Sequence, residues 1–432
     1  MDPKPEVKLS APDRDLLDDL SRRSFRYFWD QTDPHTGLVR DRALTLEGPA
    51  DANADPNIAS IAATGFGLTA FCIGADRRWV SYDVARQRVL TALHFLALEA
   101  PQEHGWFYHF MDARTGERRW QSEVSSIDTA LLLSGVLTAR QYFHHDLEIY
   151  SLATALYNRV DFPWMMSGGS FFSHGWTPEH GFIPYRWDTY SEMLILYVLG
   201  IGSPTHAVPI DVWGKWKQPV VGQEGYAYIG GGPLFIHQYS QAWLDLRDRG
   251  VPRASTEDDL TMTPVSAPRV DYFANSVVAT HAQREMFSKK LSLEFPVYSK
   301  DLWGVTASDS SAGYTDWGGT DTRVDGTVVP SAAAGSVMFA PDICIPALRN
   351  MLLKFGATIY GRYGFANAFN PETGWLSPYV VGIDAGVTLL SAENLRAGRV
   401  WRWFMSNPEP GEALDAVGLT VTTRELARAQ GE

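Results

Sequence analysis

The sequence predicts an all-α protein, an (α/α)6 toroid with long loops and a few short strands. Six segments are apolar nearly all round, as buried helices are, and helices with one charged face lie between them. Long loops rich in Gly and aromatic residues precede most of the six buried segments. Inner helices, outer partners and loops gathered at one end describe a toroid, and an irregular helical bundle is the alternative.

The first half of the chain alternates buried and half-exposed helices. Residues 13–31 place Leu and aromatic side chains at helical spacing, with Asp in the first turn, which predicts an amphipathic helix. Residues 57–75 are apolar and small, whereas residues 81–99 carry charge on one side. The same alternation follows in an apolar helix over Glu123–Phe143 and a more polar helix over residues 147–160.

The second half contains four further helices. The apolar segment Asp188–Gly200 follows a Gly/His/Trp loop, and three more helices are predicted at 271–288, 341–355 and 383–396. Short strands are expected in the long loops around 218–236 and 304–332. The helices of the buried type therefore begin near residues 57, 123, 188, 271, 341 and 383.

The loops also bear on domain organisation. The Pro/Gly-rich stretches at 202–235 and 304–335 carry Trp, Tyr and Phe, and loops of this composition pack against a core instead of linking domains. We therefore predict a flexible leader at residues 1–12 and one catalytic domain over residues 13–432.

Composition narrows the class of partner. The net charge of −13 argues against nucleic acid, because phosphate recognition needs clustered Lys and Arg. The 15 Trp, 18 Tyr and 21 Phe fit a sugar-binding cleft, although a large aromatic core explains them equally well. A neutral substrate suits this balance better than an anionic one.

The cysteines, the hydropathy and the N-terminal segment bear on the cellular location of the protein. Cys72 and Cys344 lie in apolar surroundings and read as buried thiols, with one bridge between them left open. The chain has no apolar run of about 18 residues, so no membrane insertion is expected. No signal peptide is visible, but the charged opening MDPKPEVKLSAPDRD looks like a trimmed start. A periplasmic or secreted location remains the expectation.

Carboxylates recur at the starts of the buried helices. At the loop end of a toroid they would meet in one cleft, where one acid can protonate a glycosidic oxygen and another can activate water. Helix capping is the alternative role, and it would suffice for Asp188. Glu192 follows four residues later in an apolar segment, which capping does not explain. The set comprises Glu123, Asp128, Asp188, Glu192, Asp342 and Asp384.

Glu123 and Asp128 diverge if both lie on one helix, so both can face the cleft only if the helix begins after Glu123. We place Glu123 at the mouth and keep Asp128 as a ligand for a loop or a sugar hydroxyl. No His residue has zinc-type spacing and HEXXH is absent, so we predict no metal and no other cofactor.

Several segments resemble a known family. The runs TGERRWQSEVSSIDTALLL (115–133), RWDTYSEMLILYVLGIGSPTHAV (186–208), GPLFIHQYSQAWLDLR (232–247), WGVTASD (303–309), YGFANAFNP (363–371) and GIDAG (382–386) are similar to the glucoamylase-like bacterial hydrolases, which include the β-1,2-glucanases of glycoside hydrolase family 144. The same module occurs in cyclic β-1,2-glucan synthases, so the resemblance alone does not fix hydrolysis.

The resemblance implies an (α/α)6 barrel and an inverting, metal-free attack on β-1,2-glucan, either internal or releasing sophorose from an end. Its acids fall in the SEVSSID and DTYSE segments, which gives Glu123 and Glu192, the residues also favoured by the helix argument. GIDAG departs from a GIDQG form because Ala385 replaces the amide, and this leaves chain-length preference open.

The remaining predicted contacts are with the sugar. We expect at least two of the loop residues Trp106, Trp120, Trp303 and Trp317 to stack on sugar rings. We expect Glu192 to be the general acid, because the apolar sequence after it raises its pKa.

Alternatives are a transglycosylase or phosphorylase on the same glucan, or a non-catalytic glucan-binding protein. We expect a monomer. The predicted substrate-binding residues are Trp106, Asp112, Trp120, Asp128, Asp188, Tyr190, Trp303, Trp317 and Asp384.

Overall fold

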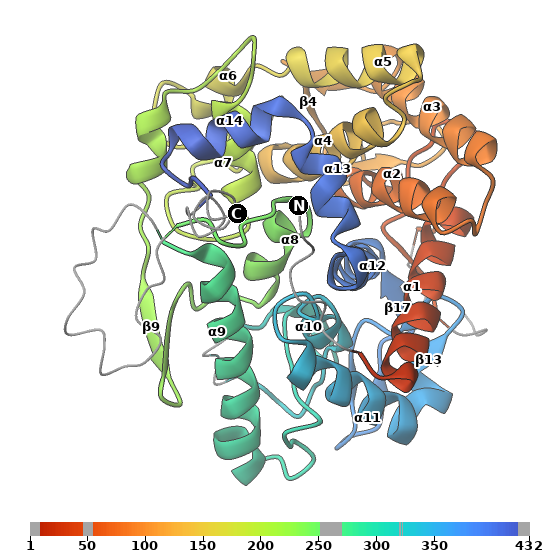
Figure 1. Ribbon diagram of the computed structural model, residues 1–432, viewed down its shortest axis with the longest axis vertical. Coiled ribbons are helices and arrows are strands. Elements are labelled where there is room, and N and C mark those ends of the chain that lie inside the picture. Colours follow the sequence, from red (N-terminus) through yellow and green to blue (C-terminus); the bar gives the residue numbers. More distant parts are fainter. Residues whose placement is uncertain (1–8, 46–54, 251–269, 319–320, 322, 422–432) are drawn as a thin grey trace, which may run out of the picture.

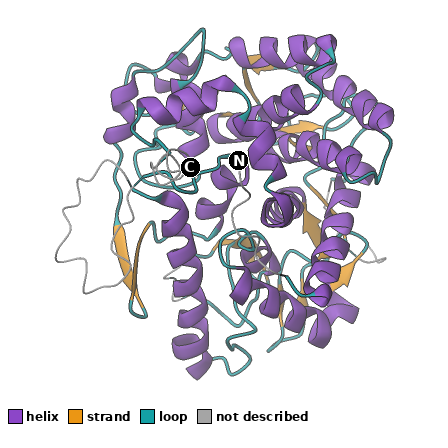
Figure 2. Cartoon of the chain, viewed as in Figure 1, coloured by secondary structure: helices purple, strands orange, loops and turns teal. Residues whose placement is uncertain are grey.

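Helices build the frame of this protein, and the strands that the structure describes form short antiparallel pairs and one three-stranded sheet between them (Figure 2). The computed structural model describes residues 9–45, 55–250, 270–318, 321 and 323–421. Over these residues no helix combines the length and the apolar character needed to cross a membrane.

Six helices form an inner ring (Figure 1). Neighbouring members contact each other through apolar side chains, and where α8 meets α10 the amide of Gln238 donates hydrogen bonds to the Ala332 carbonyl and the Ser336 hydroxyl. The predicted (α/α)6 fold is confirmed. The ring consists of α2 (Ile61–Asp76), α4 (Ser126–Tyr142), α7 (Leu194–Ile201), α8 (Phe235–Trp243), α10 (Pro330–Ala334) and α12 (Gly382–Ala397).

An outer layer covers this ring. Each outer helix is amphipathic and packs its apolar face on an inner neighbour. The outer helices are α1 (Ala11–Gln31), α3 (Tyr82–Leu98), α5 (Leu147–Asn158), α9 (Tyr272–Glu285), α11 (Pro341–Ile359) and α14 (Pro408–Ala416), with the short α6 (Phe162–Met166) beside them.

Helix α13 (Arg399–Met405) lies across the C-terminal ends of inner helices. The indole of Trp401 donates to the carbonyl of Gln241 near the end of α8, and Trp403 contacts Tyr142 at the end of α4. One end of the ring is therefore covered. The strand pairs and long loops occupy the opposite end, where the inner helices begin.

Three sequence predictions need correction. The helices near 271 and 341 are outer helices α9 and α11, because each has a polar, partly exposed face. The inner positions belong to α8 and α10, whose 9 and 5 residues are too short to show a helical period. The helix predicted from Asp188 begins only at Leu194. Helix α1 begins at Ala11, inside the predicted leader, and residues 1–8 lie outside the described part.

Strands were predicted in two loops, and both contain antiparallel hairpins. The first pairs β9 (Val220–Gln223) with β10 (Tyr226–Ile229), and the second pairs β11 (Ala307–Ser310) with β12 (Gly313–Asp316). The other antiparallel pairs are β1 (Arg42–Leu44) with β17 (Tyr379–Val381), β2 (Ile58–Ser60) with β5 (Phe110–Asp112), β3 (Gln102–Glu103) with β4 (Trp106–Phe107), β6 (Val124–Ser125) with β7 (Gly175–Thr177), β7 with β8 (Gly181–Phe182), β13 (Tyr360–Gly361) with β14 (Gly364–Phe365), and β15 (Phe369–Asn370) with β16 (Trp375–Leu376).

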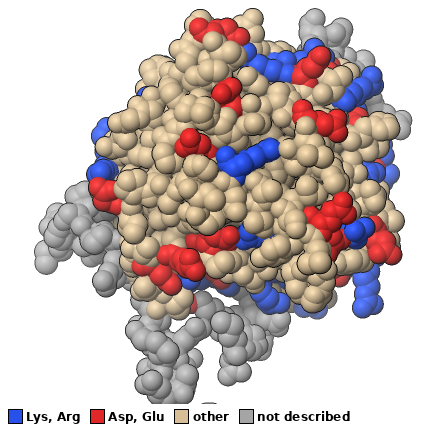
Figure 3. Space-filling model, turned by 90° about the horizontal axis from the view of Figure 1, so that it is seen from above, with Lys and Arg blue, Asp and Glu red and all other residues tan. Residues whose placement is uncertain are grey.

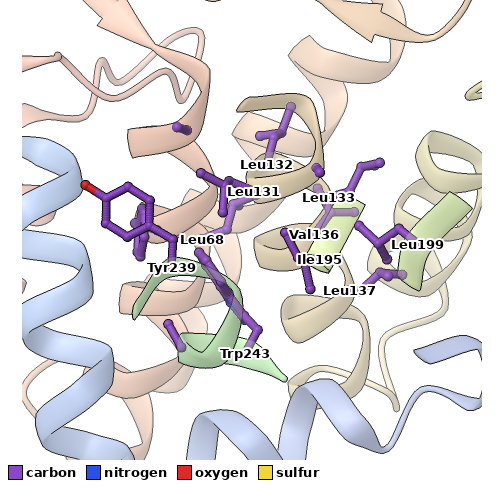
Figure 4. Close-up of a cluster of buried hydrophobic side chains, with 14 of the residues drawn as sticks. Leu68, Leu131, Leu132, Leu133, Val136, Leu137, Ile195, Leu199, Tyr239 and Trp243 are labelled. Atoms are coloured by element: carbon purple, nitrogen blue, oxygen red, sulfur yellow. The ribbon is translucent and has the colours of Figure 1, made fainter. Parts of the chain in front are cut away.

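The core lies between the inner helices. Figure 4 shows Leu and Val side chains of α4 meeting those of α2 and α7, with Trp243 of α8 beneath them. Both Cys72 and Cys344 are buried and free, as predicted. On the outside, Figure 3 shows acidic and basic side chains interspersed around broad uncharged areas of one face.

The contact between α2 and α4 is the closest in the ring. A Cβ atom on Gly135 would overlap the carbonyl oxygen of Gly65, and one on Gly65 would overlap the carbonyl oxygen of Leu131. Because both neighbours are backbone atoms, the helices themselves would have to separate to admit a methyl group.

We therefore expect Gly135→Ala to lower the free energy of unfolding by about 1–3 kcal/mol, the usual cost of overpacking a core. The matched control is Gly411→Ala in α14, where a Cβ meets nothing within 4 Å. The control should be neutral or more stable by up to about 1 kcal/mol, since Ala is the better helix former. Urea unfolding of both variants measures this, and equal stabilities would contradict it.

Candidate active site

Backbone hydrogen bonds hold the starts of three inner helices together. Gly382 at the start of α12 donates to the Asp41 carbonyl (2.7 Å), and Asp41 donates to Ile58 before α2 (2.9 Å). His109 accepts from Ile61 of α2 (3.3 Å) and donates to the Glu123 carbonyl before α4 (2.9 Å). The loop end of the barrel is thus a connected frame that carries the predicted acids.

The first acidic cluster lies at the start of α4. His109 Nδ1 is 3.0 Å from Glu123 Oε1, and its Nε2 is 3.5 Å from Asp128 Oδ2. Asp128 also accepts from the hydroxyl of Ser125, which in turn caps α4 by accepting from the Asp128 amide. Because α4 begins after Glu123, both carboxylates can face the same imidazole, as the sequence argument required.

The charges in this cluster stabilise one another. Burial alone would lower the pKa of His109, but Asp128 and the hydrogen bond to Glu123 outweigh it and raise that pKa to about 9. Burial would raise the pKa of Glu123, and the contact with His109 more than offsets it, so the pKa is lowered. The imidazole of His109 is therefore protonated at neutral pH and bridges the carboxyl groups of Glu123 and Asp128.

Glu192 has the opposite environment. Burial, with a smaller contribution from the negative charge of Asp128, raises the pKa of its carboxyl to about 7. The Ser240 hydroxyl on α8 donates to the Glu192 carbonyl and accepts from the Ile195 amide, which fixes the backbone just before α7. Glu192 is thus a half-buried acid that keeps its proton near neutral pH.

A second acidic cluster lies at the start of α12. Burial raises the pKa of Asp384 to about 7, although the Asn367 amide donates to its carboxylate (2.6 Å). Arg42 lies between two further acids, 2.9 Å from Asp41 and 3.4 Å from Asp309. The side chains of this cluster come from four segments far apart in the chain.

Acids near the starts of α4, α7 and α12 all affect the pKa of one side chain, Tyr239. The pKa of the Tyr239 hydroxyl is raised by burial and then by negative charges at Asp384, Glu192 and Asp128. The ring of Tyr239 stacks on Phe235, with centroids 4.9 Å apart. Acids from the starts of α12, α4 and α7 therefore all raise the pKa of this one hydroxyl.

Three of the four Trp residues that were predicted to stack on sugar rings are buried in the core. Trp106 and Trp303 have no exposed surface, so neither ring face can meet a sugar, and the prediction is wrong for both. Trp106 packs on Phe162 and its indole donates to the Asp161 carbonyl. Trp317 is also buried, and its indole N–H donates a hydrogen bond to the Ser308 hydroxyl. Trp120 is 62% exposed.

Other predicted contacts have internal partners. Asp112 accepts from Arg119 (2.6 Å) and from the backbone of its own turn, which is a structural role. Tyr190 is buried, and its hydroxyl is 3.1 Å from His237 Nδ1. Both groups already have partners within the fold, and their contact with a sugar stays a prediction.

Asp188 and Glu192 do not share a helical face. The backbone at Asp188 and Tyr190 is hydrogen-bonded to Lys217 instead of forming a helical turn. The Asp188 carboxylate accepts from the Lys217 ammonium (3.0 Å), which lowers its pKa. Asp188 is consequently paired at the edge of the site, where it is partly exposed.

Sequence reasoning gave no role to several residues of the site. His109 was recognisable only as a loop histidine, because its partners are 14 and 19 positions away. Tyr239, Asp309 and Asn367 lie in the GPLFIHQYSQAWLDLR, WGVTASD and YGFANAFNP segments that carried the resemblance, so those motifs were the available signal. Asp41 had none.

His109, Glu123 and Asp128 also form the one group, within the part of the chain that the structure describes, whose donor atoms are close enough to hold a metal, all within 4.8 Å. The carboxylates contact opposite nitrogens of the ring, so no single point faces all three. A protonated imidazole also has no free lone pair for a metal. The geometry is that of an ion-pair bridge.

Fold and site together define a class, an (α/α)6 barrel with paired carboxylates at its loop end. Comparison with known proteins gives the family. Residues 184–408 match the Glycoamylase family model, described as "Putative glucoamylase", and the chain belongs to this family. A Bacteroides fragilis structure with the same description is 30% identical, covers 97% of this chain and 100% of its own, and has a TM-score of 0.82.

Two relatives carry more specific descriptions. An endo-β-1,2-glucanase of Chitinophaga pinensis, solved with sophorotriose and glucose, is 26% identical, with a TM-score of 0.83 and coverage of 95% of this chain and 98% of its own. An exo β-1,2-glucooligosaccharide sophorohydrolase of Parabacteroides distasonis is 27% identical over 94% of this chain. This chain spans only 58% of the length of that curated relative. The predicted resemblance to β-1,2-glucanases is confirmed.

Chelation tests the interpretation of the His109 cluster. We expect dialysis against EDTA to leave glucan hydrolysis unchanged, since a proton already occupies the position a metal would need. Metal analysis of the purified protein before dialysis is the control. Loss of activity that returns on adding a divalent ion would contradict the ion-pair interpretation.

Proposed function

We propose that this chain is a glycoside hydrolase that cleaves β-1,2-glucan, with Glu192 as general acid and Glu123 as the group that activates water. The observation that supports this is the contrast between the two carboxyls. Glu192 before α7 has a pKa raised to about 7, whereas that of Glu123 before α4 is lowered. A protonated acid and an ionised base are the pair that glycosidic cleavage requires.

The reaction follows from these protonation states. Glu192 donates its proton to the glycosidic oxygen as the bond to the anomeric carbon breaks. Glu123 takes a proton from water, whose oxygen attacks that carbon from the opposite face, so the configuration inverts. Glu192 ends ionised and Glu123 protonated, and exchange with solvent restores both.

The substrate assignment rests on the relatives. Their descriptions name β-1,2-glucan or its oligosaccharides, and the likeness to the C. pinensis enzyme extends over nearly the whole of both chains. The net charge of −13 fits a neutral glucan and no nucleic acid. No metal or cofactor is part of the proposal.

We also propose that the protein acts in the periplasm or outside the cell, as a monomer. The exposed large apolar residues that are described include Tyr82, Val84 and Leu98 on α3, Leu147 and Tyr150 on α5, and Leu353 on α11. Exposed apolar residues scattered over several elements in this way are normal on the surface of a monomer.

The substrate is tested by incubating the protein with linear β-1,2-, β-1,3- and β-1,4-glucans and sizing the products. We expect cleavage of the β-1,2-glucan, with a ladder for internal attack or a lone disaccharide for release from an end. A parallel reaction with phosphate is the control, because glucose 1-phosphate would reveal a phosphorylase. No product from any glucan would contradict the enzyme assignment.

The acid is tested with Glu192→Gln, which keeps the shape of the side chain and removes its proton. We expect kcat to fall by roughly 10²–10⁴-fold, the usual contribution of general acid catalysis. In the wild type, kcat should decline as the pH rises through about 7, because the raised pKa of Glu192 leaves it protonated only below that value. The variant should lack this alkaline limb.

Asp384→Asn is the comparison, since the pKa of Asp384 is also raised to about 7. Near-normal turnover of Glu192→Gln with an intact fold, together with loss of the alkaline limb in Asp384→Asn, would transfer the acid role to Asp384. Circular dichroism of both variants shows whether the fold is intact.

A further inference from the structure

Trp120 differs from every other Trp in the chain. All 15 Trp residues lie in the described part, and only Trp120 is exposed, with 62% of its surface in contact with solvent. An indole left in water gives up the burial that usually stabilises it. Its position therefore needs a cause other than folding.

The backbone at this point is strained. Trp120 and the next residue, Gln121, have φ angles of 53° and 51°, in the left-handed region. Residues other than Gly adopt this region at a cost, and two in succession persist only where the surroundings enforce it. Such strain is concentrated at ligand-binding sites.

Arg118 enforces the conformation. Its guanidinium donates to the carbonyls of Gln121 (2.6 Å) and Ser122, and Glu179 holds it from the other side at 2.7 and 3.0 Å. The guanidinium also lies over the ring of Tyr108, 5.0 Å from its centre. The turn that presents Trp120 is thus built in advance of any ligand.

The indole is connected to the proposed site. It contacts Phe110 edge-on, with ring centres 5.0 Å apart, and Phe110 stacks on His109 at 3.8 Å. His109 in turn contacts Glu123. The ring of Phe110 thus separates Trp120 from the acidic cluster, at the same loop end of the barrel.

We propose that Trp120 is the stacking platform of an outer subsite and makes the protein prefer longer β-1,2-glucan chains. The inference rests on the proposed function. A pyranose presents an apolar C–H face, and an exposed flat indole held rigidly can bind that face at little entropic cost. A glucose unit remote from the cleaved bond would occupy this position.

Binding is measured by calorimetry in the Glu192→Gln background, so that the result does not depend on turnover. β-1,2-gluco-oligosaccharides of increasing length are titrated into this parent and into parents carrying Trp120→Gly or Trp120→Phe. Gly accepts the left-handed backbone, so Trp120→Gly removes the ring without disturbing the turn. Leu353→Ala on the outer helix α11, also exposed, is the matched control.

We expect Trp120→Gly to weaken the binding of long oligosaccharides by about three- to tenfold, the range of an aromatic stacking contact. The shortest oligosaccharide that binds should be unaffected. Trp120→Phe should retain most of the affinity, and Leu353→Ala all of it.

Unchanged affinity for long chains, or equal weakening at every length, would overturn the inference. Either result leaves the proposed function standing if the wild type still cleaves β-1,2-glucan. If the wild type cleaves none and the Glu192→Gln parent binds none, the proposed function itself has failed, and the subsite fails with it.

Discussion

The close packing of the inner helices is the constraint on which the rest of the structure depends. The ring can close only if the backbones of neighbouring inner helices come close to each other. Between α2 and α4 this requires glycine at positions 65 and 135, because a Cβ atom at either position would overlap a backbone atom of the other helix. The inner helices all begin at the same end of the ring. Chain segments from residues 41, 109 and 382 are then joined there by backbone hydrogen bonds, so the acids are placed by the barrel and not by a local motif.

The chemistry of the site comes from unequal solvation of similar groups. Glu123 and Glu192 precede neighbouring helices, yet one faces an imidazolium and the other does not. The contact with His109 lowers the pKa of Glu123, and the charge on Asp128 adds to the burial that raises the pKa of Glu192. His109 therefore acts on Glu123 directly, and its other partner, Asp128, acts on Glu192.

The fold was predictable as far as helical periodicity extends. Helices α2, α3, α4, α5 and α12 were found close to their observed bounds because each is long enough to show its apolar pattern. α8 and α10 were missed because helices of nine and five residues are too short to show a period. The predicted ring instead included α9 and α11, which are long but amphipathic. The predicted number of inner helices, six, was therefore right, although two of the six were outer helices.

The residues of the site were predictable only where their role depends on their neighbours in the sequence. Glu192 could be identified because its apolar neighbours in sequence are also its neighbours in space. Aromatic residues gave no such guide, since Trp106 and Trp120 lie in the same loop and only tertiary contacts decide that one is buried and the other exposed. His109 was the harder case, because its pKa is raised to about 9 only when two carboxylates approach it from other segments. A site of this kind is a property of the closed ring, and its electrostatics exist only after the helices have packed.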